Sequence, residues 1–196
     1  MARTRPYHHG NLRETLLSAA LQLIAEAGPQ GFTLREIARR AGVSHNAPYR
    51  HFRDKNELLA AVAAQGFEEL TRAMRRSAKG AAPLEKLRAA GLAYVAFALR
   101  RPQHFTVMFD TSFDQGPLPS GIRAFETLLS LLEDCQRAGQ LPAGDPRRLA
   151  LAAWSLVHGI AKLALAGSIP GPKAGVLDFA RFAISSSFGG LTKTLT

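Results

Sequence analysis

The stretch TLREIARRAGVSHNAPYRHF, residues 33–52, predicts two short helices joined by a tight turn. Thr33 and Glu36 have the spacing of a capping box, so the first helix is expected to begin directly after Thr33. Gly42 can adopt the left-handed backbone conformation that ends a helix and turns the chain. A second helix is expected over residues 45–51, with the preceding serine as its N-cap. Two short helices at this spacing are typical of a helix-turn-helix.

One face of this second helix carries side chains whose chemistry suits the edges of DNA bases. At about 100° per residue, an arc of about 140° holds four of them: His45, Asn46, Tyr49 and Arg50. In a major groove Arg can bond guanine and Asn can bond adenine, whereas hydroxyls, cations and helix N-termini suit phosphate oxygens. The predicted DNA-binding residues are Thr33, Arg35, Ser44, His45, Asn46, Tyr49, Arg50, His51 and Lys55.

The rest of the chain predicts an all-α fold of about nine helices, because apolar residues recur at spacings of three and four nearly throughout. Asp54 is expected to cap a long helix, and Asp145-Pro146 is a cap followed by proline at the first helical position. The expected helices cover residues 12–27, 34–42, 45–51, 55–79, 83–100, 102–109, 120–138, 146–167 and 174–189.

Two domains are expected to share one of these helices. Residues 1–60 form the helix-turn-helix domain, residues 80–196 form a second helical domain, and the helix over residues 55–79 connects them. A stiff junction follows, because the connector is itself a helix. Arg3, Arg5, His8 and His9 precede the first helix and form either a basic arm over DNA or a disordered tail.

Composition limits the class of protein. The 196 residues include 25 Lys and Arg against 15 Asp and Glu, and the net charge of +10 attracts polyanions such as nucleic acid. No apolar run reaches about 18 residues, and the N-terminus lacks the apolar stretch of a secretion signal, so we expect a cytoplasmic protein without membrane contact. The single cysteine, Cys135, cannot form an internal disulfide, which fits a reducing compartment.

Metal, cofactor and catalytic sites are not expected. His8 and His9 have no Cys or carboxylate at ligand spacing beside them. His104 and His158 lie in apolar helical contexts, which favours core or pocket histidines over catalytic ones. No pair of nucleophile and base is recognisable, so we expect a protein that is not an enzyme.

The segment from about Asn11 to Leu59 resembles the DNA-binding domain of the TetR (tetracycline-repressor) family. The matching residues are Gly28, Phe32-Thr33, Ile37-Ala38, Ala41-Gly42-Val43-Ser44, Tyr49, His51-Phe52, Lys55 and Glu57-Leu58. Trp154, His158 and Gly159 resemble the Trp/His/Gly (WHG) pattern of one C-terminal subgroup. Pro48 departs from the family, which more often has Leu there, and local distortion of the second helix is expected.

The resemblance implies a homodimer with an inducer cavity in each C-terminal domain. The implied ligand-binding residues are Phe97, His104, Phe105, Met108, Phe109, Phe125, Trp154 and His158. An ordinary hydrophobic core is the alternative for the aromatic members of this set. The implied dimer-interface residues are Val157, Ile160, Leu163, Ala180, Ala183 and Ile184.

These expectations combine into a transcriptional repressor that a small hydrophobic or amphipathic ligand releases from palindromic operator DNA. Two alternatives remain open at this point. An architectural DNA-binding protein would have a filled core and would ignore sequence. An enzyme, motivated only by His104 and His158, is the weaker alternative.

Overall fold

The computed structural model describes residues 12–80, 82–112 and 116–193, so the expected basic arm before the first helix lies outside the described residues. All regular elements in the described part of the chain are helices, with no strand, which confirms the all-α fold. Its elements are α1 (Leu12–Ala27), α2 (Leu34–Ala41), the 3-10 helix η1 (Pro48–Arg50), α3 (Lys55–Ser77), α4 (Pro83–Arg100), α5 (Pro102–Met108), α6 (Pro119–Arg137), α7 (Pro146–Leu165) and α8 (Lys173–Lys193).

Several helices begin and end at the residues that the sequence predicts. The Thr33 side chain accepts a hydrogen bond from the Glu36 amide, and the Glu36 carboxylate accepts one from the Thr33 amide, so the capping box is confirmed. Gly42 ends α2 in the left-handed conformation, with φ of 69°. The side chains of Asp54 and Asp145 cap α3 and α7. These caps satisfy amides that the first turn of a helix leaves unpaired.

The expected helix over residues 45–51 is wrong in type, because only η1 is helical and it is a single 3-10 turn. Proline has no amide hydrogen, so Pro48 cannot close the first turn of an α-helix. The chain makes tighter bonds instead, such as that from Ala47 N to Ser44 O at 2.9 Å. Ser44 is not an N-cap: Ala47 precedes η1, and no side chain caps it.

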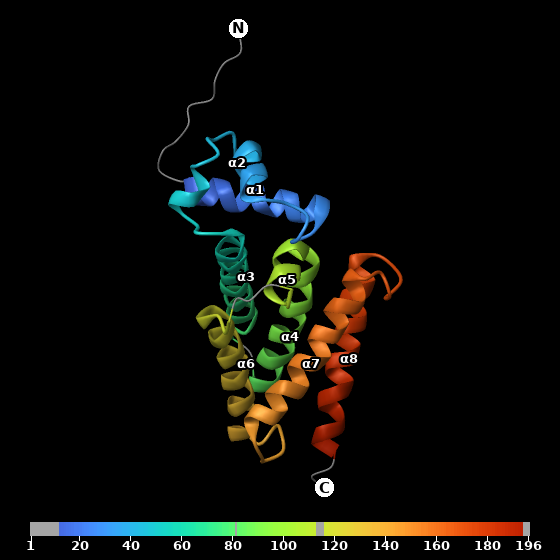
Figure 1. Cartoon of the computed structure of the whole chain (residues 1–196). Coiled ribbons are helices and arrows are strands. Elements are labelled where there is room, and N and C mark those ends of the chain that lie inside the picture. Colours follow the sequence, from blue (N-terminus) through green and yellow to red (C-terminus); the bar gives the residue numbers. More distant parts are fainter. Residues whose placement is uncertain (1–11, 81, 113–115, 194–196) are drawn as a thin grey trace.

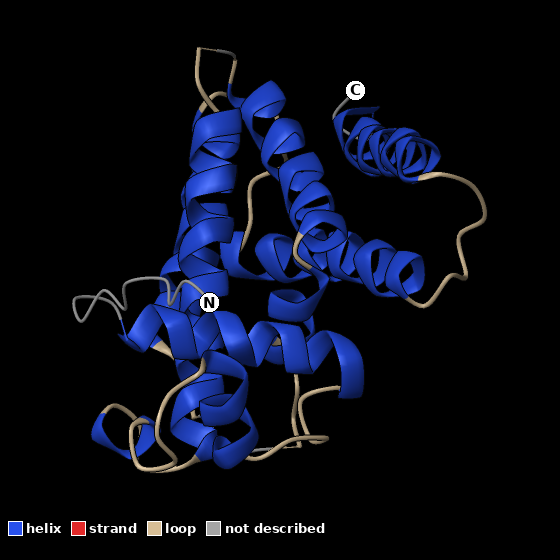
Figure 2. Ribbon diagram, turned by 90° about the horizontal axis from the view of Figure 1, so that it is seen from above, coloured by secondary structure: helices blue, strands red, loops and turns tan. Residues whose placement is uncertain are grey.

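Helices α3 and α4 form the centre of the molecule. α3 packs against α4, α5 and α6, and α4 also packs against α6, α7 and α8. In Figure 1, α1 and α2 lie across the upper end of the bundle, and α7 and α8 stand along one side. Figure 2 shows α8 at the edge of the molecule. Because α1 contacts both α3 and α5, the small N-terminal group of helices is joined to the larger bundle at two places.

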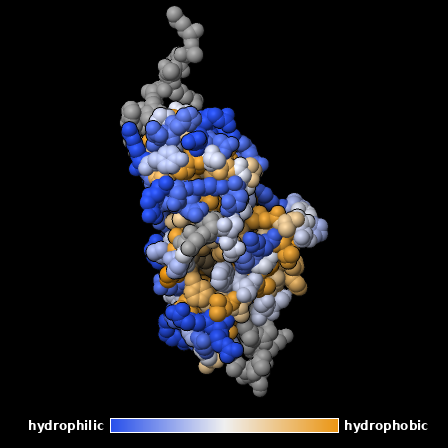
Figure 3. Space-filling view, in the orientation of Figure 1, coloured by the Kyte–Doolittle hydropathy of each residue, from blue (hydrophilic) through white to orange (hydrophobic). Residues whose placement is uncertain are grey.

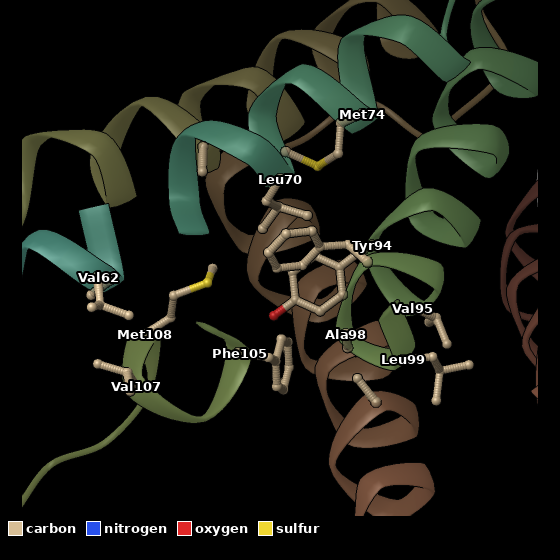
Figure 4. Packing of buried hydrophobic residues seen from close by; sticks show 14 of the residues in the cluster. Val62, Leu70, Met74, Tyr94, Val95, Ala98, Leu99, Phe105, Val107 and Met108 are labelled. Atoms are coloured by element: carbon tan, nitrogen blue, oxygen red, sulfur yellow. The ribbon is translucent and has the colours of Figure 1, made fainter. Parts of the chain in front are cut away.

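One hydrophobic core runs through both parts of the chain. Ile37 of α2, Leu58 of α3 and Phe105 of α5 have no exposed surface, and they belong to one cluster of buried residues. Figure 4 shows part of this cluster, where Leu70 and Phe105 lie near Tyr94. The packing of α5 on α3 is especially close at Gly66, where an added Cβ would lie 2.5 Å from Sδ of Met108.

The expected dimer-interface residues are mostly buried within their own chain, so most of them do not present an exposed apolar face to a second copy. Val157, Ile160, Ala180 and Ile184 are at most 7% exposed, Ala183 is half-buried, and only Leu163, at 52%, is exposed. The reason is that both α7 and α8 pack against α4, which takes up their most apolar stripes. The large apolar residues of these helices that reach solvent are Leu163, from the predicted set, and four others: Leu151, Leu165, Phe179 and Phe182.

Helix α7 is long and rich in apolar residues. Among the described residues it is the one helix long and apolar enough to cross a membrane, and 22% of that window is buried. The helix is not a continuous apolar run, because it contains Arg147, Arg148, His158 and Lys162. This result rests on length and composition alone, and α7 packs against α4, α6 and α8 as part of the helical bundle. In Figure 3 apolar atoms cover part of the side where α7 and α8 stand.

Candidate nucleic-acid interface and ligand cavity

The four residues of the predicted DNA-facing surface all face solvent. His45, Asn46, Tyr49 and Arg50 are exposed, with Tyr49 at 51%, whereas the intervening Ala47 and Pro48 are buried. Phe52 is also buried and anchors the end of the segment. The segment is therefore fixed from one side and presents its polar side outward, although it is not an α-helix.

Helix α2 is held against α1 by an ion pair as well as by apolar packing. The Arg40 guanidinium donates to both carboxylate oxygens of Glu26, at 2.7 and 2.6 Å. This hydrogen bonding lowers the pKa of Glu26. Beneath the pair, Ile37 and Ala38 have no exposed surface. The two contacts set the position of α2 and hence of the turn at Gly42.

Two of the predicted phosphate-binding groups already have partners. The Thr33 hydroxyl donates to Glu36 Oε2 at 2.9 Å, and its hydrogen bonds lower the pKa of Glu36. Lys55 Nζ donates to the Gln30 carbonyl at 3.0 Å and lies 4.7 Å from the centre of the Phe32 ring. Burial lowers the pKa of Lys55. Arg35, Ser44 and His51 are exposed and remain candidates for contact with DNA.

A second feature is an apolar cavity of about 300 Å³ inside the helical bundle. Its walls come from α3, α4, α6 and α7, from the end of α5, and from the segment before α6. Ile122, Gly116 and Pro117 line it and are also exposed, so the cavity meets solvent beside them. Figure 3 shows apolar atoms around a hollow at mid-height. A volume of this size is at the lower end of the range for small-molecule sites.

The structure divides the eight residues expected to bind a ligand into two groups. Met108, Phe109, Phe125 and Trp154 line the cavity. Phe97, His104, Phe105 and His158 do not, which corrects those four assignments as wall residues. Phe97 and Phe105 are buried core residues, and Val157, expected at a dimer interface, is a wall residue instead. Periodicity identifies the apolar side of a helix but not which neighbour that side meets.

His158 does not line the cavity, but it contacts a lining residue that the sequence did not point to. Tyr94 lines the cavity, and its hydroxyl is 2.8 Å from His158 Nδ1. The same oxygen accepts a hydrogen bond from Trp154 Nε1 at 3.1 Å. Burial raises the pKa of Tyr94 and lowers the pKa of His158. The available signal was a tyrosine in the apolar stripe of its helix, since a buried Tyr hydroxyl needs a partner.

A second missed feature joins the two parts of the molecule. Gln30, in the turn between α1 and α2, donates to the Ser112 hydroxyl at 2.7 Å. The carbonyl of the same Gln30 accepts from Lys55 at the start of α3. Ser112 lies in the segment between α5 and α6, whose later residues line the cavity. No local sequence pattern predicts a contact across 82 positions.

His104, the other histidine considered for a functional site, is buried within the helical bundle. His104 is 4% exposed, and its Nε2 is 3.4 Å from Gln65 Oε1. Burial lowers the pKa of His104. Within the described ranges, no group of three or more His, Cys, Asp and Glu residues is arranged to hold a metal ion.

A capped helix α2, a glycine turn and an outward-facing polar segment, joined to a bundle with an internal cavity, define a helix-turn-helix regulator. Residues 16–62 match the model for bacterial regulatory proteins of the tetR family, and residues 87–186 match the tetracyclin repressor-like C-terminal domain. The second match includes Trp154, His158 and Gly159. The chain belongs to the TetR family of bacterial transcriptional regulators. These are families of regulators rather than of enzymes.

Curated relatives match in the N-terminal part. The HTH-type transcriptional repressor Rv3405c of Mycobacterium tuberculosis is 36% identical over 76 residues, which are 39% of this chain and 40% of the relative. The class A tetracycline repressor from transposon 1721 of Escherichia coli is 49% identical over 49 residues, 25% of this chain and 23% of the relative. The matched segments thus span less than half the length of these relatives.

Solved structures match over nearly the whole chain. A protein with unknown function from Rhodococcus sp. RHA1 is 35% identical, with a TM-score of 0.81 over 96% of this chain and all of that one. The TetR family regulator PfmR of Thermus thermophilus is 20% identical, with a TM-score of 0.72 over 89% of this chain and 94% of that one. At 20% identity, the similarity to PfmR shows a shared fold.

Proposed function

We propose that this protein is a homodimeric repressor that binds a palindromic operator in the cytoplasm and releases it when a small apolar ligand occupies the cavity. The observation that carries the proposal is the exposure of His45, Asn46, Tyr49 and Arg50 on a segment anchored by buried Ala47, Pro48 and Phe52. An anchored row of such residues can enter a major groove without reorganising the protein.

The turn before η1 presents two further candidates for base contact. Bonds from Ala47 N to Ser44 O and from Arg50 N to Ala47 O both span three residues. With a three-residue repeat, side chains three positions apart lie one above the other. Asn46 stands three residues before Tyr49 but lies in the turn that leads into η1, so His45 and Asn46 are both exposed candidates for base contact.

The exposed apolar residues of α7 and α8 support association of two chains. Leu163 is 52% exposed and Phe182 is 68% exposed. At Gly159, one turn before Leu163 on α7, an added Cβ would meet no atom of its own chain within 4 Å. A second copy packed on this face would bury these side chains and place two η1 segments on successive half-sites.

Release by a ligand is supported by the position of the cavity relative to the DNA-binding part. Met108, at the end of α5, lines the cavity, and α5 contacts α1. The Gln30–Ser112 hydrogen bond is a second direct connection. A ligand that prefers a conformation with these contacts altered would lower operator affinity by the ratio of its two affinities. Structural neighbours include AibR with isovaleryl coenzyme A and operator DNA, and FadR with stearoyl-CoA.

The cavity also argues against the main alternative function, that of an architectural DNA-binding protein. An architectural DNA-binding protein needs no internal ligand site, and a filled core would have favoured that function. An apolar cavity costs stability, because its walls lose packing contacts. Its presence here favours a ligand-responsive regulator.

The test is DNA affinity measured by fluorescence anisotropy, with an operator selected from random duplexes and a scrambled duplex as reference. Tyr49→Ala should weaken binding to both duplexes. Arg50→Ala should lose about 1–3 kcal/mol on the operator only, if the side chain reads a base. Arg148→Ala is the matched control, because Arg148 is an exposed arginine at the start of α7. Equal losses on both duplexes with Arg50→Ala would contradict base reading.

A further inference from the structure

The described part of the cavity wall is apolar and rich in aromatic residues. No Asp, Glu, Lys, Arg or His is among the described residues that line it. Its aromatic residues are Phe67, Tyr94, Phe109, Phe125 and Trp154, which come from five separate parts of the chain. Burying an ionised group against such a wall is costly, because no counter-charge replaces its water. The chemistry therefore selects against an ionised occupant.

The size of the cavity limits the occupant further. A volume of about 300 Å³ holds about ten water molecules at roughly 30 Å³ each. A compound with one or two rings fills that space. Aromatic rings in the wall favour an aromatic occupant, because edge-to-face contacts between rings add to apolar burial.

Among the described residues that line the cavity, Tyr94 is the one with a side-chain oxygen, and the hydrogen bonds of that oxygen decide what it can offer a ligand. If His158 carries its proton on Nε2, its Nδ1 accepts the Tyr94 hydroxyl proton over the 2.8 Å contact. If His158 carries the proton on Nδ1, the Tyr94 proton loses this partner although Tyr94 is only 5% exposed. Buried hydroxyl protons are nearly always paired, so the first arrangement is the stable one.

In this arrangement Tyr94 has no proton to offer the cavity. Its oxygen accepts one hydrogen bond from Trp154 Nε1 at 3.1 Å and retains capacity to accept a second. We propose that the ligand is an uncharged aromatic compound of one or two rings whose hydroxyl or N–H group donates a hydrogen bond to the Tyr94 oxygen. His158 is a positioning residue, because it directs the Tyr94 proton away from the ligand. This inference rests on the proposed ligand-responsive function and names the ligand class.

The test uses four probes that share one carbon skeleton: 4-tert-butylphenol, its methyl ether, tert-butylbenzene and 4-tert-butylbenzoate. Isothermal titration calorimetry on the full chain measures each affinity at pH 7.5. The phenol should bind about three- to tenfold more tightly than the ether or the hydrocarbon, as expected for one hydrogen bond. The benzoate should bind at least about tenfold more weakly than the hydrocarbon.

Two variants separate recognition from shape. Tyr94→Phe should lower phenol affinity to that of the ether. His158→Phe keeps an aromatic ring beside Phe105 and Phe109 and frees the Tyr94 proton, so it should raise ether affinity toward that of the phenol. The hydrocarbon is the control for an intact cavity, and its affinity should change by less than about twofold in either variant. If a variant fails to fold, the ranking of the four probes on the unmodified chain still decides the matter.

Three results would overturn the inference: an ether that binds at least as tightly as the phenol, a benzoate that binds best, or no binding of any probe at millimolar concentration. Operator binding is recorded in parallel, so that the two proposals fail separately. Probes that rank as expected but leave operator affinity unchanged would support the ligand class and contradict ligand release. A benzoate that binds best and releases DNA would contradict the proposed ligand class and support ligand release.

Discussion

Replacing Gly66 by Ala tests how the cavity and the packing of α5 depend on each other. The new Cβ would lie 2.5 Å from Met108 Sδ, 3.0 Å from Met108 Cγ and 3.2 Å from His104 Cβ. Favourable contacts between such atoms need about 3.5–4.0 Å, so the Met108 thioether must move by about 1 Å. Met108 lines the cavity and can move into it, whereas His104 Cβ is tied to the backbone of α5.

The expected cost follows from a comparison of two alanine variants. Overpacking a core costs about 1–3 kcal/mol, and a flexible thioether beside an open cavity places Gly66→Ala near the lower end. Gly121→Ala is the control, because its Cβ would be in ordinary contact, 3.4 Å from the Phe67 ring, and it also stands in a helix that borders the cavity. Gly66→Ala should therefore be less stable than Gly121→Ala by about 1–2 kcal/mol.

Urea denaturation followed by circular dichroism, at one protein concentration, measures this difference. The same variant should bind 4-tert-butylphenol more weakly, because Met108 then occupies part of the cavity. Operator affinity without ligand should stay within about twofold, since α1 and α2 are untouched. Equal stability of the two alanine variants would show that α5 does not pack on α3 as described, and the reasoning would fail.

Three further predictions concern other parts of the chain. Thr33→Ala removes the N-cap of α2 and should lower the free energy of unfolding by about 1 kcal/mol in urea denaturation, whereas Thr33→Ser should restore most of it; equal stability of the two variants would count against the cap. Burial lowers the pKa values of His104 and His158. Near and below the ordinary histidine pKa of about 6.5, the unfolded chain therefore binds more protons than the folded chain, and the free energy of unfolding should fall as the pH drops from about 7.5 to 5.5. A free energy of unfolding that does not change over this pH range would contradict the burial of these histidines. Phe182→Glu replaces an apolar side chain that is 68% exposed by a charged one and should shift the sedimentation coefficient from that of two chains to that of one. Arg181→Glu, at the neighbouring exposed position, is the control and should leave the sedimentation coefficient unchanged. An unchanged sedimentation coefficient with Phe182→Glu would place the dimer interface elsewhere.

Local chemistry predicted much of this fold. The starts of α2, α3 and α7 follow from Thr33, Asp54 and Asp145-Pro146, because a capping side chain and its amide lie within three residues of each other. Pro48 predicted a distortion of the second helix for the same reason, although not that the helix would shrink to a 3-10 turn. Such features depend only on neighbours along the chain.

Features that depend on packing between helices were harder to predict. Apolar stripes on α7 and α8 marked residues for burial, but the sequence does not say whether α4 or a second chain covers them. Ile160 and Ile184 proved to face their own chain, and Phe182 proved to be exposed. Tyr94 was missed as a cavity residue because its partners, Trp154 and His158, are 60 and 64 positions away.

The central claim is that the segment around Tyr49 and Arg50 reads DNA sequence as part of a symmetric dimer. Selection of random-sequence duplexes by the purified protein, followed by sequencing, tests it most directly. The account predicts enrichment of an inverted repeat with half-site centres about one helical turn or somewhat more apart, and loss of that enrichment with the double variant Tyr49→Ala and Arg50→Ala. Enrichment of no sequence, or of the same sequence by the double variant, would contradict it.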